Sequence, residues 1–198
     1  ELIGGALGAG KSSLVDITFD ITNPNNCVLI VEDNGVGITS LKRITRWAAS
    51  ETGDNLTENV YGHGSKKTLV KFCPNYKDAD WTLEWRRKGN LNKLIAPFKG
   101  IDTEHIDDND EDKTTCKDNG TKWTIHFNIS VLGEDYNTPK ELMNALEEII
   151  RTRYEPSDYQ PYTINVTVIK DDVVIKEDSS NWKSLKETLS EEVDNGGI

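Results

Sequence analysis

Residues 32–38 read Glu-Asp-Asn-Gly-Val-Gly-Ile and follow the apolar run Cys-Val-Leu-Ile-Val at positions 27–31. A short apolar run of this kind, bounded by polar residues and glycine, predicts a buried strand that ends in acidic side chains. Gly35 and Gly37 allow the backbone after the strand to approach a ligand closely. The stretch therefore predicts a binding loop at a strand end, with Asp33 as its carboxylate.

Period-two alternation of apolar and polar residues predicts further strands on both sides of this stretch. Residues 14–21 alternate, and the Asn-Pro-Asn-Asn sequence at 23–26 predicts a turn, so residues 14–31 form a hairpin. Further strands are expected at residues 81–85, 91–98, 122–129, 162–169 and 173–176. Asp171 and Asp172 are expected to turn the last hairpin.

Apolar residues at helical spacing predict several helices between these strands. The clearest begins at Thr138, an expected N-cap whose capping-box partner is Glu141. Other helices are expected at residues 1–7, 40–49 and 184–192, and one directly after Gly64. Helices interspersed with hairpins predict an α+β fold, a two-layer sandwich whose mostly antiparallel, mixed sheet is covered by helices on one face.

Composition limits the class of protein. The 198 residues include 23 Lys and Arg against 34 Asp and Glu, a formal charge of −11, which argues against broad coating of nucleic acid or anionic membrane. Seven acids in residues 102–112 predict a solvated loop.

Cys27, Cys73 and Cys116 form no CxxC pair, which predicts free thiols. With no long apolar run, we expect a cytoplasmic or nuclear protein without a membrane partner.

Residues 5–12 read Gly-Ala-Leu-Gly-Ala-Gly-Lys-Ser and satisfy the phosphate-binding pattern GxxxxGK[ST]. A P-loop follows a buried strand and opens a helix at its lysine, here Lys11. Residues 14–21 instead alternate and are rich in β-branched side chains, which predicts a strand. A P-loop NTPase is therefore kept only as a second alternative.

Four short motifs follow one another along the chain in a fixed order. They are a helix that begins with Glu1, the box at residues 33–37, the glycine-rich box Tyr-Gly-His-Gly-Ser-Lys at 61–66, and Gly120-Thr121 opening a strand. In this order they resemble the GHKL ATPases, the superfamily of gyrase B, heat-shock chaperone, histidine-kinase and MutL ATP-binding domains. The glycine-rich box and the opening Glu-Leu-Ile are most similar to the microrchidia (MORC) type.

The resemblance implies the ATP-binding Bergerat fold over residues 1–176, with residues 177–198 leading as a helix or linker toward a following domain. It also implies that the family's first strand and the start of its first helix precede Glu1. As ATP-binding residues it implies Asp33, Gly35, Gly37, Ile38, Gly62, His63, Gly64, Ser65, Lys66 and Thr121.

These residues have distinct roles in the family. Asp33 would accept the adenine amino group, Thr121 would assist through a water, and Lys66 would face the terminal phosphate. Glu1 would be the general base for the attacking water. The family's microrchidia members commonly have Asn where this chain has His63.

One position departs from the family pattern. The family's magnesium-binding Asn lies four residues after the base, and this chain has Gly5 there. Because glycine has no side-chain oxygen, it cannot ligate Mg²⁺. The metal ligands stay unknown, and Mg²⁺ as a cofactor is in doubt.

The resemblance implies an ATP-gated clamp in which residues 50–65 form a lid and two protomers close, with slow or impaired hydrolysis. The alternative is a degenerate, non-catalytic nucleotide-binding or interaction module. A DNA- or chromatin-related role is implied by the microrchidia and MutL resemblance, with DNA bound through other parts of a longer protein. A basic cluster, residues 86–88 with Lys93, is a local candidate for such contact.

Overall fold

The computed structural model describes residues 2–7, 12–38, 64–75, 79–87, 90–96, 106–108, 119–133, 136, 138–154 and 162–179. The expected helices at 40–49 and 184–192, and residues 50–63 of the lid expected at 50–65, lie outside these residues. The described helices are α1 (Leu2–Leu7), α3 (Gly64–Phe72), α4 (Pro139–Arg153) and the short 3-10 helix η2 (Ile129–Val131). The described strands are β1 (Leu14–Asp20), β2 (Cys27–Asp33), β3 (Trp81–Arg87), β4 (Asn90–Ile95), β5 (Ile106–Asp108), β6 (Gly120–Phe127), β7 (Thr163–Lys170) and β8 (Val173–Asp178).

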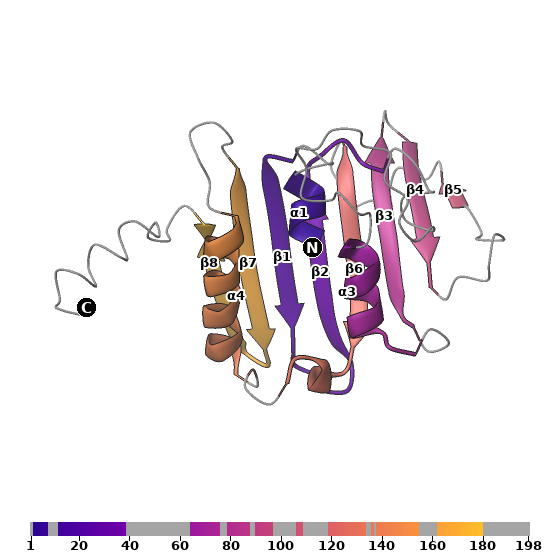
Figure 1. The fold of residues 1–198 in the computed structure, drawn as a ribbon. Coiled ribbons are helices and arrows are strands. Elements are labelled where there is room, and N and C mark those ends of the chain that lie inside the picture. Colours follow the sequence, from indigo (N-terminus) through magenta and orange to yellow (C-terminus); the bar gives the residue numbers. More distant parts are fainter. Residues whose placement is uncertain are drawn as a thin grey trace.

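The described strands form one mixed sheet in the order β5-β4-β3-β6-β2-β1-β7-β8. Neighbouring strands are antiparallel except for β1 and β7, which are parallel. The α+β class with a mostly antiparallel, mixed sheet is confirmed. In Figure 1 the helices α1, α3 and α4 lie in front of the sheet, over the same face.

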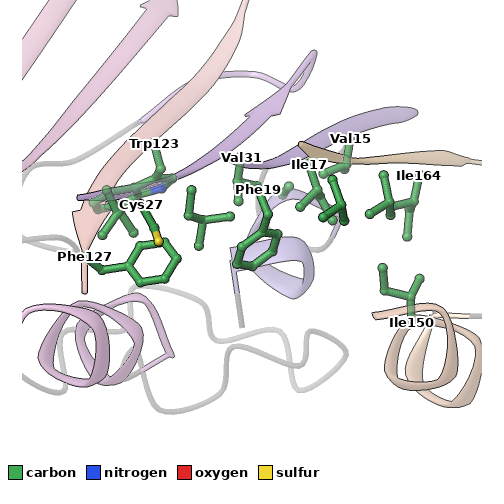
Figure 2. Packing of buried hydrophobic residues seen from close by; sticks show 14 of the residues in the cluster. Val15, Ile17, Phe19, Cys27, Val31, Trp123, Phe127, Ile150 and Ile164 are labelled. Atoms are coloured by element: carbon green, nitrogen blue, oxygen red, sulfur yellow. The ribbon is translucent and has the colours of Figure 1, made fainter. Parts of the chain in front are cut away.

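Alternating side chains on the central strands make the core. On β1, for example, Val15, Ile17 and Phe19 are buried whereas Asp16 is exposed. Figure 2 shows strand side chains that point toward the helices, and Ile150 of α4 pointing back toward Ile164 of β7. Burying one such side chain contributes about 1.5–3 kcal/mol, so this one-sided pattern fixes the register of the strands.

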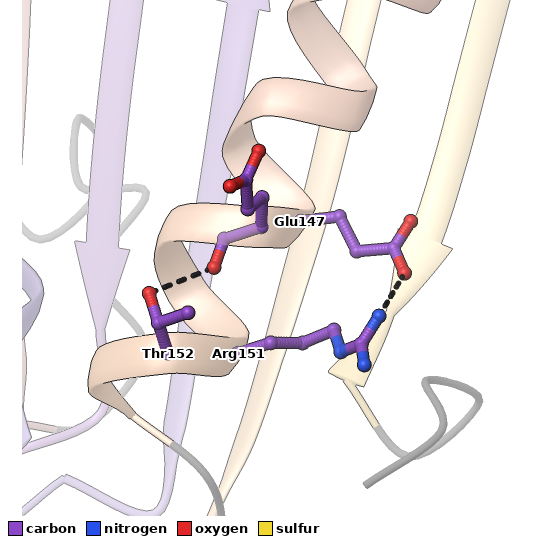
Figure 3. A network of polar contacts seen from close by, with 4 residues as sticks. Glu147, Arg151 and Thr152 are labelled. Carbon is purple, nitrogen blue, oxygen red and sulfur yellow. Dashed lines mark hydrogen bonds and ion pairs between the residues drawn. The ribbon is translucent and has the colours of Figure 1, made fainter. Parts of the chain in front are cut away.

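Helix α4 begins as the sequence predicts. The backbone N–H of Glu141 donates to Thr138 Oγ1 at 3.3 Å, and Thr138 N–H donates to Glu141 Oε2 at 3.1 Å, which completes the capping box. Farther along the helix Arg151 pairs with Glu147 at 3.4 Å, and Thr152 Oγ1 donates to the carbonyl of residue 148 at 2.9 Å (Figure 3). The cap determines where α4 starts, and its apolar face determines where it packs.

Two details differ from the sequence expectations. Residues 106–108 lie in the acidic stretch expected as a loop, yet they pair as β5 with β4 at the sheet edge. Edge pairing uses backbone groups and needs no buried side chain, so acidic residues tolerate it. The second difference is η2, which the apolar pattern did not indicate and which starts at the side chain of Asn128.

Among the residues described, no helix is long and apolar enough to cross a membrane. Cys27 and Cys73 are free thiols, as expected, and Cys116 lies outside the described residues.

Candidate functional site

The Asp33 carboxylate lies at the end of β2 and is held by several donors. The hydroxyl of Ser12 and the backbone N–H of Gly35 both donate to Asp33 Oδ1, each at 2.8 Å. Asp33 is paired across the sheet with Thr121 of β6. Two donors on one oxygen fix the plane of the carboxylate.

Burial dominates the electrostatics of this group. Removal from water raises the pKa of Asp33 above its ordinary value, while the hydrogen bonds from Gly35, Ser12 and Thr121 act in the opposite direction. Partly buried carboxylates with raised pKa values and fixed orientations are frequent in functional sites.

Gly120 allows β6 to begin beside Asp33. Its φ is +147°, and a β-carbon at this position would lie 2.0 Å from the carbonyl oxygen of Asp33. No side chain fits in that space, so glycine is required for the approach that brings Thr121 next to the carboxylate.

The loop after β2 contains two further glycines. Gly35 and Gly37 are both buried, and Gly37 has a φ of +73° in the left-handed region. Ile38 packs against the core and anchors the end of the loop.

Asn34 ties this loop to the start of β1. Its Oδ1 accepts from the backbone N–H of Ser13 at 2.9 Å and of Leu14 at 3.0 Å, and its Nδ2 donates to Ser13 Oγ at 3.0 Å. The segment that precedes β1 and the segment that follows β2 are therefore one connected unit.

Of the expected ATP-binding residues, the structure brings together Asp33, Gly35, Gly37, Ile38 and Thr121. Gly64, Ser65 and Lys66 form the first turn of α3, and α3 lies against α1, the helix that contains Gly5. Glu1, Gly62 and His63 lie outside the described residues. Among the residues described, no group of three or more His, Cys, Asp or Glu side chains could hold a metal ion.

The phosphate-loop alternative fits the described geometry poorly. Residues 5–7 belong to α1, Ser12 and Ser13 precede β1, and β1 begins at Leu14. A P-loop would continue as a helix through Ser12, whose hydroxyl here donates to Asp33 instead.

The hydrogen bond from Ser12 to Asp33 is not predicted by the sequence patterns above. The expected hairpin contains this signal, because the register that pairs Val15 with Asp33 continues to place residues 12–14 opposite residues 34–36, next to Asp33. The pattern GxxxxGK[ST], which includes Ser12, predicts a contact with phosphate instead.

Acidic side chains lie beside the basic cluster at residues 86–88 and Lys93. Lys93 forms a 3.1 Å ion pair with Glu84 across the β3 and β4 hairpin, and Lys122 lies 3.7 Å from Glu32 on the same face of the sheet. Lys88 lies outside the described residues. These ion pairs reduce the positive potential that the hairpin offers to a phosphate backbone.

No family model matches this chain, and no curated protein matches it by sequence. Among solved structures, the crystal structure of the N-terminal domain of a DNA repair protein matches 96% of this chain with a TM-score of 0.53 and 13% identity. The Aquifex aeolicus MutL ATPase domain complexed with ADP matches 96% of this chain with a TM-score of 0.47 and 12% identity. This chain spans 54% of the first solved chain and 64% of the second.

The first of these matches shows that the chain shares the fold of that DNA repair domain. The microrchidia type is not tested by either match.

Proposed function

We propose that this chain binds ATP as a GHKL-type domain, with the adenine amino group donating to the Asp33 carboxylate. The observation that carries the proposal is the partly buried Asp33 carboxylate, oriented by Ser12 and Gly35 and placed beside Thr121. A partly buried, ionised carboxylate is costly unless hydrogen-bond donors surround its oxygens, and an exocyclic amino group is such a donor.

The remaining roles follow the family resemblance. Gly35, Gly37 and Ile38 border the base and ribose, and Thr121 assists Asp33 through a water. Gly62, His63, Gly64 and Ser65 offer backbone N–H groups to the phosphates near the start of α3, and Lys66 adds a positive charge. Asp33 thus selects the base, and the glycine-rich box binds the phosphates.

We propose that hydrolysis is slow, with Glu1 as the general base for water attack on the terminal phosphate. ATP-driven closure of two protomers and a DNA- or chromatin-related role, through other parts of a longer protein, complete the microrchidia-like proposal. Light scattering that shows the same monomer mass with and without ATP would contradict the closure.

A second function is favoured by one specific observation. Gly5 lies within α1 at the position of the family's metal-binding Asn, and it offers no oxygen ligand. The alternative is therefore nucleotide binding without catalysis, in which the domain reports the presence of ATP by a change of conformation.

Calorimetric titration with a non-hydrolysable ATP analogue tests the proposal. Asp33→Asn keeps the shape of the side chain but replaces one acceptor oxygen with an NH₂ donor, so the affinity should fall about 30-fold. Asp16→Asn is the matched control, because Asp16 is exposed on the other face of the sheet and accepts from Asn165 Nδ2 at 2.7 Å. Its affinity should equal that of the wild type.

Lys11→Ala separates this proposal from a P-loop. We expect Lys11→Ala to bind the analogue as the wild type does, whereas a P-loop would lose it. Unchanged binding in Asp33→Asn together with loss in Lys11→Ala would overturn the proposal. Titrations with and without Mg²⁺ then separate the two functions, since a module that has lost its metal ligand should bind equally in both.

A further inference from the structure

Ser12 connects two parts of the candidate site that are far apart in the sequence. Its backbone N–H donates to the carbonyl of Ala6, in the last turn of α1, at 3.1 Å. Its hydroxyl donates to Asp33 Oδ1 at 2.8 Å, and the residue is buried, with 8% of its surface exposed. One serine therefore bridges α1 and the carboxylate at the end of β2.

This contact constrains the proton state of the carboxylate as well as its orientation. A hydroxyl that donates to Oδ1 favours the ionised form, in which both carboxylate oxygens are acceptors. With Ser12 and Gly35 both on Oδ1, the second oxygen, Oδ2, remains in a fixed direction in the same plane. An ionised, fixed acceptor accepts from the 6-amino group of adenine and repels the 6-oxo group of guanine.

We propose that Ser12 is the positioning residue that gives the site its preference for adenine over guanine nucleotides, by holding Asp33 as an oriented acceptor. This inference rests on the proposed ATP site at Asp33. It assigns to Ser12 a role toward the base, whereas the phosphate-loop pattern would assign it to a metal-bound phosphate.

The experiment compares the affinity of the chain for non-hydrolysable ATP and GTP analogues. In Ser12→Ala the affinity for the ATP analogue should fall about 10-fold, while the weaker affinity for the GTP analogue stays the same or rises. Ser12→Thr keeps the hydroxyl and should retain the wild-type preference. A residue that only stabilised the fold would lower both affinities together.

Ser13→Ala is the matched control, since Ser13 is the adjacent serine, is exposed and contacts Asn34 rather than Asp33. It should leave the ratio of the two affinities unchanged. If Ser12→Ala lowers the melting temperature too far for titration, Ser12→Cys replaces it, because a thiol has similar size and is a weak donor. The same loss of preference is expected.

The outcomes separate this inference from the proposed function. A wild-type chain that binds the ATP analogue, with an unchanged preference in folded Ser12→Ala or Ser12→Cys, overturns the role of Ser12 alone. Loss of preference in folded Ser12→Thr also overturns it. A wild-type chain that binds neither nucleotide overturns both proposals.

Discussion

Polar side chains near both ends of strand β2 form hydrogen bonds with residues far away in the sequence, but the two ends use different chemical groups. Before the strand, Asn26 Oδ1 lies 3.1 Å from His126 Nδ1, and Asn25 Oδ1 accepts from Asn128 Nδ2 at 3.4 Å. After the strand, the Asp33 carboxylate accepts from Ser12 and Gly35. The first end uses exposed asparagine amides and an imidazole, and the second uses a partly buried acid.

The two ends of β2 differ in the free-energy cost of the polar groups that they use. Neutral amides join neighbouring strands at little cost, because their other polar atoms remain in water. Burial of a charged carboxylate costs free energy, and this cost raises the pKa of Asp33. An acid at the second end is a costly way to connect strands, which is consistent with its proposed role as an acceptor for a ligand.

The largest effect is expected from the glycine beside the carboxylate. Gly120→Ala would bring a β-carbon to 2.0 Å from the carbonyl oxygen of Asp33, so strand β6 must shift. We expect a loss of about 3 kcal/mol in the free energy of unfolding, measured by urea denaturation.

Gly133→Ala is its control. Gly133 has a φ of +93° and no atom within 4 Å of the added β-carbon, so backbone strain alone should cost about 1 kcal/mol. Equal losses in the two variants would show that the close contact at Asp33 is unimportant.

Asparagine substitutions should distinguish the two ends next. Asn34→Ala removes three hydrogen bonds to residues 13 and 14 and should cost about 2 kcal/mol, with weaker binding of the ATP analogue. Asn26→Ala removes one exposed contact and should cost about 0.5 kcal/mol without changing binding. Reduced nucleotide affinity in Asn26→Ala would contradict the assignment of the site to the Asp33 end.

Much of this fold follows from the sequence. The β1 and β2 hairpin, the β7 and β8 hairpin and the capping box of α4 were predicted because alternation, turn residues and caps act over a few residues. The parallel pairing of β1 with β7 joins segments about 150 residues apart, and no local pattern encodes it.

The candidate site divides in the same way. A local motif predicts Asp33, Gly35 and Gly37 as site residues. The order of motifs in the family predicts Thr121. The contact of Ser12 with Asp33 depends on the register of the hairpin, and the close contact at Gly120 depends on the position of β6 in the sheet. Local reasoning finds the residue types, and the sheet determines which of them meet.

The smallest effect on stability is expected from a change in pH. Because burial raises the pKa of Asp33, the folded protein keeps a proton that the unfolded chain releases above the ordinary value of 3.8. Stability from this group therefore falls as pH rises through the raised folded pKa. Binding of adenine requires the ionised form, so affinity rises over the same interval.

Asp33→Asn removes this titration. Urea denaturation across that pH range should show its stability rising relative to the wild type as pH increases. A difference between the two proteins that is independent of pH, or that falls as pH increases, would contradict the buried-acid description of Asp33.

We propose that nucleotide binds at the Asp33 end of β2 and not at the Asn26 end. Backbone amide NMR of the labelled chain, titrated with a non-hydrolysable ATP analogue, tests this most directly. We predict the largest shift changes at Gly35, Gly37 and Thr121, with little change at residues 23–26. Changes confined to residues 23–26, or to residues 8–11 alone, would contradict the account.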